Sequence, residues 1–188
     1  MLPTIALRPM TPDDVDDVYI DWFHDPEVFR FLEVRNLTKP RALAYLREGL
    51  ESGCRFQFIV QDAADDERIG TIKIGDIDWK HGTSDLVTVL GNRAYWGRGV
   101  AREAIRMAID KAFGELGVRK LSASMYSSHL GSAKAYIAAG FLIEAVLFGQ
   151  YLHEGQVVDK IIVSRFNPLL FPHLPHFPLP VHAPLTHR

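Results

Sequence analysis

Residues 95–103 read YWGRGVARE, which places two glycines and an arginine between an apolar run and a helical pattern. The run before it, VTVLG at residues 87–91, is rich in the β-branched and apolar residues of a buried strand. After it, apolar side chains recur at helical spacing, at Ala101, Ala104, Ile105, Ala108 and Ala112. The stretch therefore predicts a strand, a glycine-containing turn and a long helix that ends at Gly117.

The turn has the composition of an anion receptor. Glycines at positions 97 and 99 remove two side chains and permit backbone angles that other residues avoid. The amides of residues 97–102 can then converge at the positive end of the helix, where they suit a phosphate or pyrophosphate. The chain has neither G-x-x-x-x-G-K-[ST] nor a G-x-G-x-x-G within a βαβ unit, which excludes two other phosphate loops. A tight turn without a ligand is the alternative.

The composition narrows the class of protein. A chain of 188 residues with 47% hydrophobic and 23% charged residues fits one globular domain with a small appendage. A net charge of −2 gives no general attraction for nucleic acid or acidic lipid. One cysteine, Cys54, excludes an internal disulfide framework, and neither a signal peptide nor a membrane-spanning run is recognisable. We therefore expect a cytoplasmic protein with no nucleic-acid or membrane partner.

The order of the predicted elements indicates the fold class. Helices are expected at residues 11–23, 38–52, 100–117 and 130–140, and strands at residues 4–10, 55–63, 68–79, 85–91, 119–126, 141–152 and 156–166. This order predicts a mixed α/β domain, of the α+β type, over residues 4–166, built around a largely antiparallel sheet. Residues 167–188 are a proline-rich C-terminal tail.

Two groups of residues resemble metal ligands only superficially. The acidic cluster Asp13, Asp14, Asp16 and Asp17 is predicted to be the solvated N-terminus of the first helix, because no matching ligands follow nearby. The histidines of the proline-rich tail are expected to be solvated side chains. We therefore expect no metal.

Two blocks of sequence resemble a known family. WGRGVAREAIRMAIDKAF at residues 96–113, followed by HLGSAKAYIAAGF at residues 129–141, is similar to the GCN5-related N-acetyltransferases, the GNAT superfamily. The two blocks resemble most the branch with ribosomal-protein N-terminal acetyltransferases and nucleotide-amino-sugar acetyltransferases. The acyl-CoA loop of that family, [Q/R]-x-x-G-x-[G/A], is matched except that Trp96 replaces Gln or Arg. In the second block His129 replaces the usual asparagine, whereas Ser132, Tyr136, Gly140 and Phe141 match.

The resemblance covers residues 4–166 and implies a fold and a co-substrate. The fold is a mostly antiparallel seven-stranded sheet with splayed central strands and about four helices. The co-substrate is acetyl-CoA, whose pyrophosphate is expected on the loop residues Gly97, Arg98, Gly99, Val100, Ala101 and Arg102. Its pantetheine arm is expected beside Val89, Leu90 and Gly91, where an N–H polarises the thioester carbonyl. His129, Ser132 and Tyr136 are expected to complete the cofactor side of the site.

The implied reaction is direct attack of a primary amine on the thioester, without an acyl-enzyme. Tyr136 stands where many family members place the acid that protonates the leaving thiolate. A tyrosine that only packs on its helix face is the alternative. Asp85 is the preferred general base, and His81, His153 and Glu144 are weaker options. Cys54 as a nucleophile is the rival mechanism, and it has no histidine nearby in the sequence.

The acceptor is the most open question at this level. Arg35 and Asn36 precede a capped helix, where the related enzymes form their acceptor pocket, and can hold a carboxylate, a phosphate or a sugar hydroxyl. This favours a small polar acceptor such as an amino sugar, with a protein or peptide N-terminus as the alternative. A non-catalytic acyl-CoA sensor is the alternative from another class. A homodimer through residues 156–166 or the tail is also open.

Overall fold

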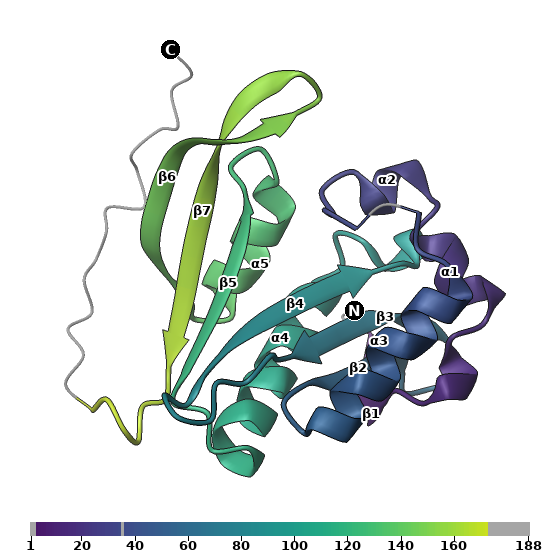
Figure 1. The fold of residues 1–188 in the computed structure, drawn as a ribbon, viewed down its shortest axis with the longest axis horizontal. Helices are drawn as coiled ribbons and strands as arrows, with labels where there is room; N and C mark the ends of the chain where they lie inside the picture. The colour runs from purple at the N-terminus through teal and green to yellow at the C-terminus, as the bar shows by residue number, and fades with distance from the viewer. Residues whose placement is uncertain (1–2, 35, 173–188) are drawn as a thin grey trace.

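The computed structural model describes residues 3–34 and 36–172 (Figure 1). Seven strands form one sheet in the order β1-β2-β3-β4-β5-β7-β6. Every neighbouring pair is antiparallel except β4 with β5. The predicted α+β class with a largely antiparallel sheet is therefore confirmed. Residues 173–188 of the predicted tail lie outside the described residues.

The elements follow the predicted order. The strands are β1 (Ile5–Pro9), β2 (Phe56–Asp62), β3 (Arg68–Ile74), β4 (Thr83–Leu90), β5 (Lys120–Tyr126), β6 (Leu142–His153) and β7 (Gln156–Phe166). The described helices are α1 (Asp17–Trp22), α2 (Pro26–Phe29), α3 (Lys39–Ser52), α4 (Val100–Asp110) and α5 (Leu130–Ala138). Short turns of 3₁₀ helix cover Pro12–Asp14 (η1) and Arg93–Tyr95 (η2), and a π turn covers Lys111–Glu115 (η3). No described helix is long and apolar enough to cross a bilayer.

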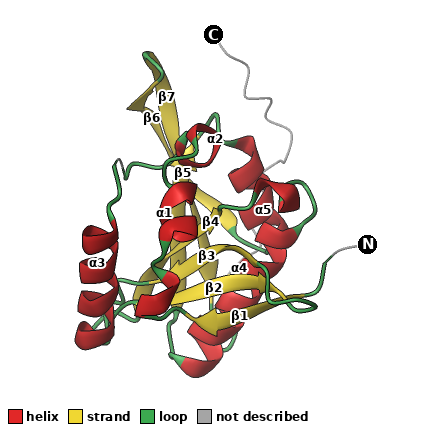
Figure 2. Ribbon diagram, turned by 90° about the vertical axis from the view of Figure 1, so that its right-hand side faces the viewer, coloured by secondary structure: helices red, strands yellow, loops and turns green. Residues whose placement is uncertain are grey.

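Helices cover both faces of the first half of the sheet. In Figure 2, α1 and α3 lie on one side of β2, β3 and β4, and α4 lies on the other. The alanine face predicted from the sequence is the one that packs, because Ala104, Ala108 and Ala112 are fully buried against the sheet. Such small side chains let a helix approach the strands closely, which brings the start of α4 near the end of β4.

The two central strands separate along their length. β4 and β5 pair only through residues 83–85 and 120–122. Beyond this short parallel ladder β4 continues beside β3 and β5 continues beside β7, so the two strands diverge (Figure 1). We call this divergence the splay and its paired end the apex. The backbone edges that face the splay have no strand partner, which leaves room for an extended ligand to pair as a strand would.

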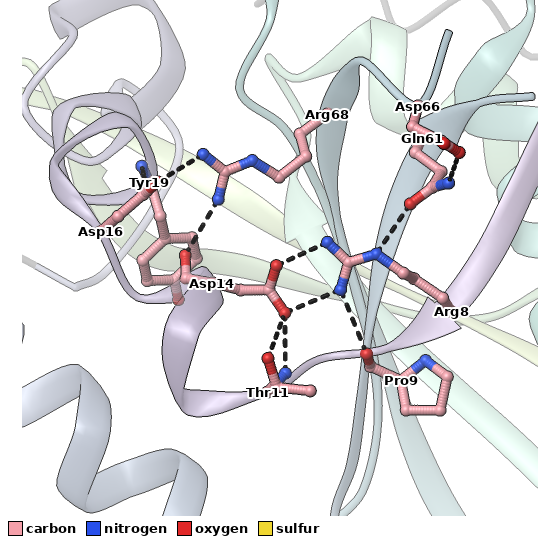
Figure 3. A network of polar contacts seen from close by, with 9 residues as sticks. All are labelled: Arg8, Pro9, Thr11, Asp14, Asp16, Tyr19, Gln61, Asp66 and Arg68. Atoms are coloured by element: carbon pink, nitrogen blue, oxygen red, sulfur yellow. Dashed lines mark hydrogen bonds and ion pairs between the residues drawn. The ribbon is translucent and has the colours of Figure 1, made fainter. Parts of the chain in front are cut away.

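The first helix differs from its prediction. A 3₁₀ turn replaces its beginning, and α1 is capped by Asp16, which accepts a hydrogen bond from Tyr19 N at 3.0 Å. Asp14 is buried, and Arg8 donates to it at 2.8 Å (Figure 3). Asp16 accepts from Arg68 at 2.6 Å. The prediction of a solvated acidic cluster is therefore wrong for Asp14, because arginines on β1 and β3 neutralise this end of α1.

Two other boundaries differ. β3 ends at Ile74 and not at residue 79. The helix that begins at Val100 is regular only to Asp110 and then widens into the π turn before Gly117. Gly117 adopts the left-handed conformation expected at a helix end, with φ of 66°.

Candidate active site

The loop between β4 and α4 presents bare backbone. Gly97 and Gly99 have φ of 73° and 79°, a conformation that other residues rarely adopt, and Gly99 is the N-cap of α4. Within the described part of the chain, the amides of residues 97–99 donate no hydrogen bond. The first amides of α4 have no intrahelical acceptor either. The geometry predicted from the two glycines, in which free N–H groups gather at a helix N-terminus, is present.

Side chains from other elements hold this loop in place. Tyr95 donates its hydroxyl to Glu67 at 2.7 Å and to Asp62 at 3.1 Å, which ties the loop to the turn between β2 and β3. Trp96 donates its indole N–H to the carbonyl of Leu90 at 2.9 Å. Trp96 therefore fixes the loop to the end of β4, a contact that its departure from the family pattern did not reveal.

An unsatisfied arginine lies at the same helix end. The Nε atom of Arg102 is buried and has no hydrogen-bond partner among the described residues. Arg98 is exposed at the rim, with its guanidinium carbon 5.8 Å from the centre of the Tyr95 ring. A buried donor without a partner is uncommon and suggests a ligand. The loop amides and Arg102 together fit an anionic group such as a pyrophosphate.

The edge of β4 faces the splay at alternate residues. The carbonyl of Asp85 accepts from Gly75 N at 3.2 Å, so the backbone of Asp85 is directed to the β3 side. In an antiparallel pair this direction alternates, which directs the backbone groups of Leu86, Thr88 and Leu90 to the splay. The carbonyls of Leu86 and Leu90 accept side-chain donors, and the N–H of Thr88 interacts with the hydroxyl of Tyr136. Among the described residues, the groups that remain open are the carbonyl of Thr88 and the N–H of Leu90.

Val89 and Gly91, predicted to lie beside the pantetheine arm, both make packing contacts within the protein. The carbonyl of Val89 is directed to β3, so close to Gly70 that a Cβ atom added to Gly70 would lie 2.1 Å from the carbonyl oxygen. The side chain of Val89 packs on the core of α1 and α3. At Gly91 a Cβ atom would lie 2.0 Å from the ring of Trp22. Gly91 is therefore needed for α1 to pack beneath the end of β4, and the sequence around it carries no signal of that contact.

Tyr136 reaches the apex of the splay from α5. Its side chain is only 4% exposed, and its hydroxyl donates to the carbonyl of Leu86 at 2.7 Å. The hydroxyl of Thr88 is 3.3 Å away. Burial raises the pKa of Tyr136 above its usual value, so the phenol is neutral. The ring packs in the core while the hydroxyl lies at the apex, and the role of Tyr136 as a general acid stays a prediction.

Asp85 lies on the opposite face of the sheet, in a hollow. This hollow has a volume of about 470 Å³ and is lined by Lys73, Asp76, Thr83, Ser84, Asp85 and Ser122. The amine of Lys73 is 3.2 Å from the carboxylate of Asp85 and 3.3 Å from the hydroxyl of Tyr45 on α3. Burial raises the pKa of Asp85, and attraction by Lys73 opposes the shift only in part.

The sequence identified Asp85 but not the residues around it. Lys73 lies on β3, Asp76 in the loop that follows, and Ser122 on β5, and only the sheet brings them together. No local pattern marks any of the three. Asp85 and Leu86, whose carbonyl accepts from Tyr136, are consecutive residues of β4, and the charge of Asp85 contributes to the raised pKa of Tyr136.

An aromatic cluster spans the wide end of the splay. The imidazole of His129 stacks on Phe31 with a centroid distance of 4.1 Å, and Phe31 also stacks on His153 at 4.9 Å. Burial and the charge of His153 lower the pKa of His129 to about 4. An ion pair at 3.0 Å joins Arg30 to Glu154 at the tip of the β6–β7 hairpin. The cluster links the loop after α2 to the second half of the sheet.

The remaining predicted site residues lie near this cluster. Ser132 is partly buried in the first turn of α5, behind His129. Asn36 is exposed and has φ of 51°. Arg35 lies outside the described residues. Binding of a ligand by these residues stays a prediction.

Comparison with known proteins identifies the family. A sequence model described as an acetyltransferase (GNAT) domain matches residues 4–142, which is most of the chain. The chain belongs to the GNAT acetyltransferase family. This GNAT chain is therefore an N-acetyltransferase, as its resemblance implied.

Individual relatives agree with that assignment. The chain is 28% identical over 166 residues to an uncharacterised N-acetyltransferase, p20, from Bacillus licheniformis, covering 85% of this chain and 91% of the relative. The fold is shared with a spermidine N-acetyltransferase from Vibrio cholerae, solved with CoA and spermine, at a TM-score of 0.79, 18% identity and coverage of 87% and 95%. It is also shared with a ribosomal-protein-S5-alanine acetyltransferase from Vibrio fischeri, at a TM-score of 0.74, 23% identity and coverage of 87% and 93%. The GNAT fold predicted from the two motifs is thus confirmed.

Proposed function

We propose that this N-acetyltransferase transfers the acetyl group of acetyl-CoA to the primary amine of a small polar acceptor such as an amino sugar. The acceptor enters through the hollow beside Asp85, on the sheet face that also carries α3. The observation that carries the proposal is the character of this lining. Three of its six residues are hydroxyl-bearing, at Thr83, Ser84 and Ser122, and suit an acceptor rich in hydroxyls.

The charges of the hollow argue against a polycation. Lys73 is paired with Asp85, and Arg55 donates to Asp76 at 2.6 Å. Each carboxylate of the lining therefore already has a cation, and Arg55 is also 3.5 Å from Glu48. A polyamine, of the kind named for the Vibrio cholerae neighbour, is recognised best by carboxylates that lack a partner. A neutral polar acceptor with one reactive amine needs no such excess.

The cofactor side of the proposal relies on main-chain groups. The free amides of the loop and the unpartnered Arg102 fit the pyrophosphate of acetyl-CoA. The open carbonyl of Thr88 and the open N–H of Leu90 fit the amides of the pantetheine arm in the splay. We accordingly assign the pantetheine contacts predicted for Val89 to its two neighbours. This arrangement directs the thioester to the apex, between Tyr136 and Asp85.

Two proton transfers are needed in the reaction. Asp85 receives the proton that the amine loses, and its raised pKa makes it a better base than an ordinary aspartate. Tyr136 donates its phenolic proton to the departing sulfur, and bulk solvent later restores it. Because the two groups lie on opposite faces of β4, attack and departure occur from opposite sides of the sheet. No covalent link to the protein is required.

The test is a thiol-release screen with acetyl-CoA and a panel of amines. The panel contains nucleotide-amino sugars, aminoglycosides, polyamines and short peptides with a free N-terminus. Turnover highest with the sugars supports the proposal. Turnover highest with polyamines or peptides replaces the acceptor class, and tight CoA binding with no thiol release from any amine favours a sensor.

A further inference from the structure

A chain of polar side chains runs from the hollow into the second half of the sheet. Ser122 lines the hollow and is the cross-strand partner of Ser164 on β7, and their hydroxyl oxygens are 3.3 Å apart. Ser164 is fully buried and donates to Glu144 Oε2 at 2.5 Å. The other oxygen of Glu144 is 2.5 Å from the amine of Lys120. Four side chains on three strands thus form one continuous chain of contacts.

The carboxylate of Glu144, near one end of this chain of contacts, determines which serine hydroxyl donates and which accepts. Burial by itself raises the pKa of Glu144, but hydrogen bonds from Lys120 and Ser164 outweigh it and lower the pKa, so the carboxylate is ionised and can only accept. Ser164 has one hydroxyl hydrogen, and it is used on Glu144. The bond between the serines therefore has Ser122 as its donor. The remaining lone pair of Ser122 is directed away from Ser164.

We infer that Ser122 accepts a hydrogen bond from the amine of the acceptor, and that Ser164 and Glu144 act as positioning residues that keep its oxygen an acceptor. The inference rests on the proposed use of the hollow by an amine, whatever class of molecule carries that amine. Holding one N–H on Ser122 orients the nitrogen lone pair, which must point at the thioester for attack. Asp85 is the better candidate for the base, because the two oxygens of Glu144 are occupied by Lys120 and Ser164 and Glu144 does not line the hollow.

Because Lys120 holds one oxygen of residue 144, the substitution Glu144→Gln is expected to reverse the donor–acceptor order of the two serines. In Glu144→Gln the ammonium of Lys120 selects the amide oxygen, so the amide NH₂ faces Ser164. Ser164 then accepts at that end and donates to Ser122. The hydroxyl hydrogen of Ser122 is displaced towards the hollow, where it opposes the N–H of the acceptor. One substitution of nearly equal size therefore turns an acceptor into a donor.

The experiment uses the amine that wild type turns over fastest, so it does not depend on the acceptor class. Glu144→Gln is expected to raise the KM for that amine about 10-fold and to leave the KM for acetyl-CoA unchanged. Ser122→Ala is expected to raise the amine KM about 5-fold by removing the contact. Ser124→Ala is the matched control, because Ser124 is an exposed serine on the same strand outside the chain of contacts. Melting curves confirm that each variant folds.

The outcomes separate this inference from the proposed function. An unchanged amine KM in both Glu144→Gln and Ser122→Ala overturns the inference, and leaves the acceptor class as the amine panel found it. An equal rise in the KM for both substrates also overturns it, because that result reports a general structural effect. A rise for the amine alone, absent in Ser124→Ala, supports it even if the preferred amine is a peptide or a polyamine.

Discussion

The proposed cofactor loop and the proposed acceptor hollow offer their ligands opposite kinds of contact. The loop at residues 97–102 offers main-chain N–H groups within one short stretch of sequence. The hollow is built from side chains of β3, β4, β5 and the loop after β3, at positions up to 49 residues apart. Backbone recognition needs glycines and a helix start, which one local motif can encode. Side-chain recognition needs a folded sheet, so its parts can vary separately and adapt the enzyme to an acceptor.

The strongest test of this comparison is a substitution of Tyr136, whose hydroxyl lies between the two regions. Tyr136→Phe removes the phenolic proton at the apex and keeps the ring that packs in the core. We expect turnover to fall by about 10²–10⁴-fold, as for loss of a general acid. The affinity for CoA, measured by calorimetry, is expected to stay within about 2-fold, because the loop amides are untouched. An unchanged turnover would remove Tyr136 from the chemistry.

Gly99→Val tests the backbone side of the comparison. A β-branched residue in the left-handed region costs of order 1–3 kcal/mol, so the loop leaves the conformation that gathers its amides. The Kd for CoA is expected to rise by about 5- to 150-fold, measured by calorimetry. Gly114→Ala is the control, since Gly114 lies in the π turn with no atom near a new Cβ. Wild-type affinity in Gly99→Val would mean that the pyrophosphate binds elsewhere.

Gly91→Ala tests the packing that positions both regions. The new methyl would lie 2.0 Å from the Trp22 ring, so α1 must move away from the end of β4. We expect the free energy of unfolding to fall by about 1–3 kcal/mol, measured by urea denaturation. Gly131→Ala, whose nearest neighbour is 3.9 Å away, should be nearly neutral. Equal stability of the two variants would contradict the contact.

The smallest expected effect is on stability in acid and concerns Asp14, which lies outside both the cofactor loop and the acceptor hollow. Burial alone raises the pKa of Asp14, but Arg8 and Thr11 outweigh it and lower the pKa below its unfolded value. The resulting stability is complete above the unfolded pKa of about 3.9 and is lost as the pH falls through the folded value. Asp14→Asn should flatten the dependence of the free energy of unfolding on pH below about 4, by about 1 kcal/mol or less, as measured by urea denaturation at several pH values. Asp13→Asn serves as the control, because Asp13 is exposed. An identical acid slope in Asp14→Asn and wild type would show that the pair is not linked to folding.

Local patterns were sufficient for most of the fold. The alanine face of α4, the cap of α3 by Thr38 and its left-handed end at Gly53 were readable because each depends on neighbours in the chain. The first helix was misread because its acids are held by arginines on two strands: Arg8 lies six residues before Asp14 but on β1, and Arg68, which holds Asp16, is 52 residues away on β3. The stretch DPEVFRFLEVRN at residues 25–36 indicates a short helical turn that runs into a loop, and the four-residue α2 is that turn.

The amino-acid sequence alone was sufficient to identify the family, the glycine turn proposed to bind phosphate and the tyrosine at the apex. Each is written in consecutive residues whose spacing has a direct physical meaning. The folded sheet was needed to establish which edge of β4 is open, which groups surround Asp85, and how Glu144 orients the serine hydroxyls. These depend on the order in which the strands pair, and strand pairing joins residues that are distant along the chain.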